Sequence, residues 1–190
     1  MTRYALKNLF AAASLPDAET AVDALYAKYH DLDGVLSADE YSLVNTIGER
    51  AAMLLKLSAA LSSRRITEKF KIGSRYSQDS VRELLVALFR GVSVEMLYAV
   101  SFDSDDRLLS VDLVSEGTVN GSSTTPRRLA DVAVKNRAAS IIIAHNHPGG
   151  VATPSSLDFS FTATVREVLS SVGVPLTAHY TVAGNACEKI

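Results

Sequence analysis

Hydrophobic residues recur every three or four positions through most of the first 65 residues, which places them on one face of an α-helix. The pattern is clearest over residues 17–31 and 49–65. The positions on these faces are Ala21, Leu25, Tyr29, Ala52, Leu55 and Ala59. Between the two segments, Gly and Asp residues are typical of short helix connections. The pattern predicts a small, all-helical module over residues 1–70.

The hydrophobic period changes after a polar segment at residues 66–78, where we expect a linker. A capped amphipathic helix is predicted next, ending at Gly91. Beyond it, alternating or continuous apolar runs are typical of strands. We expect strands over 95–103, 107–119, 140–144 and 176–184, and helices over 125–138 and 154–173. The fold class is therefore a mixed α/β or α+β domain over residues 71–190, behind the helical module.

Composition narrows the classes of protein that this chain can be. Its 190 residues suffice for one mid-sized domain or two small ones with a genuine core. A hydrophobic content of 47% and a net charge of -2 argue against disorder and against a strongly basic surface for nucleic acid. The single cysteine, Cys187, excludes an internal disulfide and a multi-cysteine zinc site. No apolar stretch reaches the roughly 20 residues of a membrane span. We expect a cytoplasmic protein with no membrane contact.

Two of the four histidines, His145 and His147, directly follow the apolar run SIIIA. Residues i and i+2 of a strand lie on the same face, so both imidazoles can reach one metal ion. A polar strand end without metal is the alternative. The turn PGG comes next, and Asp158 in the following helix is the candidate third ligand. Two histidines and one carboxylate leave the open position that a catalytic zinc ion requires.

The string HNHPGGVATPSSLD has the spacing His-x-His-x7-Ser-x2-Asp and resembles the JAMM (MPN+ or JAB) metallopeptidase signature. Together with GTV, TPRRLADVAVKNRAAS and TPSSLD around it, the segment of about residues 80–184 resembles the bacterial RadC proteins. The resemblance implies a JAMM-type, cytidine-deaminase-like mixed sheet with flanking helices. It also implies one zinc ion per chain, bound by His145, His147 and Asp158. The implied activity is hydrolysis of a peptide or isopeptide-type amide in an unknown peptide or protein substrate.

The resemblance further implies a glutamate general base far upstream of the histidines. Glu95 and Glu116 are the two candidates. In JAMM proteins the base stands at the start of the strand that follows the first helix, which matches Glu95. Ser155 is the predicted donor to the oxyanion, because it lies near a helix N-terminus. Its ordinary alternative is an N-cap of that helix, a position for which Thr153 and Ser156 are rivals.

Other parts of the chain depart from the RadC pattern. RadC proteins commonly carry an aspartate-histidine pair near His179, but here Ala178 precedes the histidine, so we predict a structural role for His179. RadC proteins also usually continue with a further strand. We expect the short segment after residue 184 to lack that edge strand.

The segment LSADEYSLVNTIGERAAMLLKLSAAL resembles the helix-hairpin-helix unit of RadC proteins, with Thr46 in place of the first turn glycine and Gly48 kept. Such turns bring backbone N–H groups close to a DNA phosphate. This resemblance implies weak DNA contact through residues 30–60. The alternative functions are therefore a DNA-associated binding module with a structural metal, as in a DNA repair protein, and a protein-interaction scaffold without turnover. The oligomeric state is not predicted.

Overall fold

The computed structural model describes residues 3–117, 125–148 and 150–190. The last residues of the strand expected over 107–119, and Gly149 of the PGG turn, lie outside the described residues. None of the described helices is both long enough and apolar enough to cross a membrane.

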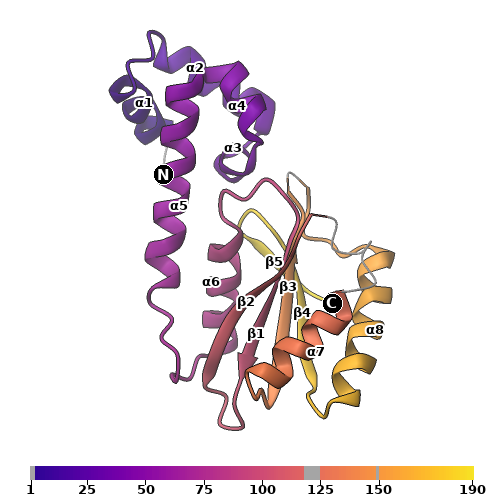
Figure 1. Ribbon diagram of the computed structural model, residues 1–190. Helices are drawn as coiled ribbons and strands as arrows, with labels where there is room; N and C mark the ends of the chain where they lie inside the picture. The colour runs from indigo at the N-terminus through magenta and orange to yellow at the C-terminus, as the bar shows by residue number, and fades with distance from the viewer. Residues whose placement is uncertain (1–2, 118–124, 149) are drawn as a thin grey trace.

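The N-terminal part is helical, as predicted (Figure 1). Its helices are α1 (Arg3–Ala12), α2 (Ala18–Tyr29), α3 (Leu32–Ser37), α4 (Glu40–Ile47) and α5 (Glu49–Thr67). Three of them begin at an aspartate whose carboxylate accepts a hydrogen bond from a backbone N–H in the first turn, namely Asp17, Asp31 and Asp39. The buried side chains that join these helices include Phe10, Leu25, Leu43 and Leu55. This module therefore has a hydrophobic core of its own.

The chain enters the second part through turns after α5 and then forms α6 (Gln78–Phe89). The two parts are in contact along α5 and α6. Lys56 Nζ donates to the backbone carbonyls of Leu36 and Gly91, at 3.1 Å each. Ser63 Oγ donates to the carbonyl of Ala87 on α6. The division of the chain at residue 70 stays a prediction.

A five-stranded mixed sheet with helices on both faces forms the second part, which confirms the predicted α/β class. Its remaining elements are β1 (Met96–Phe102), β2 (Leu108–Glu116), α7 (Thr125–Lys135), β3 (Ser140–Asn146), α8 (Ser156–Ser171), β4 (Leu176–Ala183) and β5 (Ala186–Lys189). The strand order is β2-β1-β3-β4-β5, and only β3 and β4 are parallel among the described pairs. Helices α7 and α8 cover one face and α6 the other (Figure 1).

The expectation that no edge strand follows residue 184 was wrong, because β5 pairs with β4 from Ala183↔Ala186 to Tyr180↔Lys189. Gly184, at φ +55°, and Asn185 make the two-residue turn between these strands. The turn reverses the chain directly, so four residues are enough to cover the edge of β4. Because β5 takes that edge, β4 lies inside the sheet, and buried side chains cover both of its faces.

Candidate metal centre

The two histidines of HNH lie at the end of β3, on the face that α7 and α8 cover. Ile141 and Ile143 of β3 pack into the core beneath α7 and α8. Every second residue of a strand lies on the same face, so His145 lies on this face as well. Asp158 belongs to the first turn of α8, and its side chain is fully buried. The loop between β3 and α8 therefore brings the aspartate back over the end of the strand.

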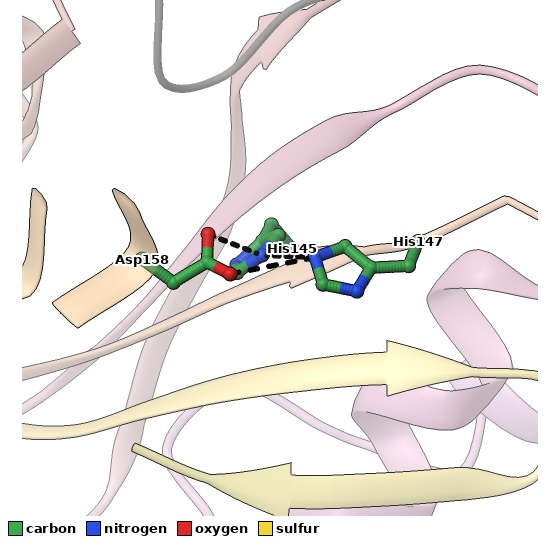
Figure 2. Close-up of side chains that lie close together, drawn as sticks. All are labelled: His145, His147 and Asp158. Atoms are coloured by element: carbon green, nitrogen blue, oxygen red, sulfur yellow. Dashed lines mark hydrogen bonds and ion pairs between the residues drawn. The ribbon is translucent and has the colours of Figure 1, made fainter. Parts of the chain in front are cut away.

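Three ligand atoms converge on one point in this place (Figure 2). His145 Nε2 lies 3.1 Å from His147 Nε2 and 3.1 Å from Asp158 Oδ1. His147 Nε2 lies 3.6 Å from Asp158 Oδ2. Ligand atoms on a tetrahedral zinc ion, with bonds of about 2.0–2.1 Å, are about 3.3 Å apart. The spacing of these three side chains therefore suits a small tetrahedral ion.

A chain of buried hydrogen bonds determines which nitrogen of His145 carries the proton. Thr162 Oγ1 donates its one hydrogen to the carbonyl of Asp158 at 2.6 Å, so it must accept from His179 Nδ1, at 2.6 Å. Burial lowers the pKa of His179 to about 3 and that of His145 to about 4, so both rings are neutral at pH 7. His179 Nε2 is then an acceptor, and His145 Nδ1 donates to it at 2.8 Å. This leaves a lone pair on His145 Nε2.

The other histidine is oriented in the same way by a backbone group. His147 Nδ1 lies 2.9 Å from the carbonyl of Val151, which can only accept. The proton of His147 is therefore on Nδ1, and the lone pair of Nε2 is the one that can bind a metal ion. Two imidazole lone pairs and a carboxylate then face one another across less than 4 Å, an arrangement that repels unless a cation or a proton lies between them. His145, His147 and Asp158 can hold a metal ion.

Ser155 is the N-cap of α8, rather than Thr153 or Ser156. Its backbone N–H and its hydroxyl each donate to Asp158 Oδ2 at 2.7 Å, and its Oγ accepts from the Asp158 N–H at 3.3 Å. This reciprocal capping box holds the aspartate carboxylate in place. Ser155 is an exposed residue, although its hydroxyl bond to Asp158 is partly buried. The role of Ser155 as donor to an oxyanion stays a prediction.

The sheet register separates the two candidate general bases. Leu97 of β1 pairs with His145 of β3, so these two side chains lie on the same face of the sheet. Glu95 is two residues before Leu97 and therefore also lies on the face of the histidines. Glu116 pairs instead with Met96, whose side chain packs on the α6 face. On that face the pKa of Tyr98 is raised, by burial first and then by the Glu116 carboxylate. The geometry favours Glu95, whose catalytic role stays a prediction.

His179, for which we predicted a structural role from the missing aspartate, is hydrogen-bonded to His145. The available signal in the sequence is the polar row Thr177, His179 and Thr181, which alternates with apolar residues in LTAHYTV. In the structure His179 and Thr181, which pair with Ile143 and His145 of β3, lie on the buried side that carries the ligands, whereas Thr177 lies at a register shift and is exposed. Thr181 is also fully buried, and its hydroxyl has no hydrogen-bond partner among the described residues.

Comparison with known proteins identifies the family. A family model described as the RadC-like JAB domain matches residues 75–188. The chain belongs to the RadC-like JAB domain family. Among RadC-like relatives, a UPF0758 protein of Azotobacter vinelandii is 33% identical over 170 residues, with 86% of this chain and 76% of the relative covered. A UPF0758 protein of Halorhodospira halophila is 34% identical over 161 residues, with 83% and 72% covered. These names state no activity, so RadC membership supports the fold and the site but not a reaction.

Proposed function

We propose that this protein is a zinc-dependent hydrolase of the JAMM type that cleaves a peptide or isopeptide-type amide. The observation that carries the proposal is the convergence of His145 Nε2, His147 Nε2 and the Asp158 carboxylate, with each nitrogen within 3.6 Å of one of the two carboxylate oxygens. Both histidines are held in the tautomer that a metal ligand needs. Two nitrogens and one carboxylate oxygen are donors that zinc accepts, and three protein ligands leave one position open. The single cysteine, Cys187, supports a cytoplasmic location.

The residues around the three ligands supply the rest of the chemistry. A zinc ion bound here would act as a Lewis acid and lower the pKa of a water toward about 7. Glu95 takes a proton from the attacking water and gives it to the amide nitrogen as the C–N bond breaks. Ser155 donates a hydrogen bond to the oxyanion that forms on the carbonyl carbon, after its hydroxyl rotates away from Asp158.

Metal content and one matched pair of variants test this function. Protein purified without chelator should contain about one equivalent of zinc, in line with a three-ligand site. Less than about a tenth of an equivalent, with no uptake on addition of zinc, would refute the proposal.

A pool of quenched fluorescent peptides then tests turnover. Glu95→Gln should lower cleavage to a small residual rate and retain zinc, whereas Glu116→Gln, on the opposite face of the sheet, should cleave normally. Bound zinc with no cleavage of any peptide or isopeptide probe would favour a protein-interaction scaffold instead.

A second candidate is weak DNA contact through residues 30–60. The observation that favours it is Gly48, which joins α4 to α5 at φ +78° and begins the 19-residue helix α5 with no side-chain cap. Uncapped N–H groups at a helix N-terminus suit a phosphate. Fluorescence anisotropy with a labelled DNA duplex at low salt tests this candidate. We expect salt-sensitive binding that is unchanged in Glu95→Gln; no binding at about 20 mM salt would eliminate it.

A further inference from the structure

Asn146, the residue between the two histidines, forms hydrogen bonds to the backbone on both sides of Glu95. Its Nδ2 donates to the carbonyl of Val94 at 3.0 Å, and its Oδ1 accepts from the N–H of Met96 at 2.8 Å. The residue is buried, with 3% of its surface exposed. Both partners are about 50 positions earlier in the chain, so local structure does not account for this contact.

The Asn146 amide extends the pairing between β1 and β3 beyond its last backbone pair. The described register of these strands ends at Leu97↔His145. A side-chain amide offers one C=O and N–H donors, like a peptide unit, so it can take the place of the next backbone pair. On the other side of the same segment, the N–H of Gly117 donates to the carbonyl of Glu95 at 2.8 Å. Residues 94–96 are therefore held from both neighbouring strands.

We infer that Asn146 is a positioning residue, which holds the backbone of Glu95 at a set place relative to the metal ligands. This inference rests on the proposed function, in which Glu95 is the general base. Because His145, Asn146 and His147 are consecutive, one short stretch of backbone carries two ligands and the support of the base. A base must be held to within about 0.5 Å of its productive place, and an error of about 1 Å can cost about 100-fold in rate.

An asparagine supplies both the donor and the acceptor that this contact uses. Aspartate keeps an acceptor for the Met96 N–H but places an oxygen against the carbonyl of Val94. Alanine removes both bonds, and glutamine is longer by one methylene group. Asn146→Ala therefore removes both bonds. Asn146→Asp removes only the bond to the Val94 carbonyl and keeps the size of the side chain.

Hydrogen exchange of the Met96 amide, followed by NMR in the full chain, tests the contact without any substrate. In Asn146→Ala this amide should exchange about fivefold faster or more, as expected for one lost hydrogen bond. In Asn146→Asp it should stay nearly as protected as in the wild type. The matched control is Asn136→Ala, because the Asn136 amide donates to Ser110 Oγ at 2.6 Å and Asp112 Oδ2 at 2.8 Å, both on β2 and away from residues 94–96. That control should leave the Met96 amide unchanged.

Turnover and zinc binding test whether the contact acts through Glu95. Asn146→Ala and Asn146→Asp should each keep about one equivalent of zinc and lower kcat about 10- to 100-fold with KM nearly unchanged. Combined with Glu95→Gln, neither should lower the residual rate further, because both changes remove the same function. Asn136→Ala should keep kcat within about twofold of the wild type, although it too loses part-buried hydrogen bonds.

Two results would overturn the inference: unchanged exchange of the Met96 amide in Asn146→Ala, or additive losses of rate in the double variants. Failure of the proposed function gives a different pattern. In that case the wild type binds no zinc, or Glu95→Gln cleaves as well as the wild type, while the exchange experiment still reports whether Asn146 holds residues 94–96.

Discussion

Replacement of His179 by leucine should weaken metal binding, although His179 is not itself one of the three candidate ligands. Leucine fills most of the buried space but removes the acceptor of His145 Nδ1–H, which lies 2.8 Å from His179 Nε2. A buried donor without an acceptor costs about 1–3 kcal/mol. His145 can avoid this cost by moving its proton to Nε2, where Asp158 Oδ1 is 3.1 Å away. That tautomer places a hydrogen where the metal ion has to bind.

The expected loss of zinc affinity in His179→Leu is about 10- to 100-fold, the usual effect of losing a partner that orients a metal-bound histidine. Competition with a chromophoric chelator at pH 7.5 measures the Kd. Thr162→Val removes the acceptor of His179 Nδ1, which is 2.6 Å away, and should weaken binding in the same direction by a smaller factor. It leaves the bond between His145 and His179 in place.

Thr181→Val is the matched control for His179→Leu. Thr181 is the next residue on the same face of β4, it is fully buried, and its hydroxyl has no partner among the described residues. Valine has the same shape, so this variant should keep the zinc affinity of the wild type and lose no stability. A folded His179→Leu protein that binds zinc within about threefold of the wild type would refute the role of His179 in fixing the tautomer.

Two further predictions concern stability. The metal-free protein should lose stability as the pH falls from about 6.5 to 4. In the folded protein the pKa of His145 is about 4 and that of His179 about 3, so both stay largely neutral in this range, whereas the same histidines take up protons in the unfolded chain. Urea midpoints across this range measure the loss, and a midpoint that rises as the pH falls would contradict it. Ser155→Ala should lower the free energy of unfolding by about 1 kcal/mol through the lost N-cap and should weaken zinc binding. Ser156→Ala, one residue into α8, should change the free energy of unfolding and the zinc affinity little. Equal effects of Ser155→Ala and Ser156→Ala would refute the role of Ser155 as the N-cap.

Much of the candidate site could be predicted from the sequence because it depends on neighbours along the chain. The positions i and i+2 of a strand share a face whatever the strand packs against, so His145 and His147 could be paired from their spacing alone. Ser155 and Asp158 are three residues apart, which is the spacing of a capping box, and the structure shows that box. The helices before residue 66 were predicted on the same local basis.

The tertiary structure decided which residues support those ligands. His179 reaches His145 only because β3 and β4 are parallel neighbours, and Asn146 reaches the backbone beside Glu95 only because β1 is antiparallel to β3. The pairing of Met96 with Glu116, next to a bulge, puts Glu116 on the opposite face. Strand order and register arise from packing between segments far apart in the chain, and one residue of slip moves every side chain to the other face. Hydrophobic period and residue spacing do not carry that information.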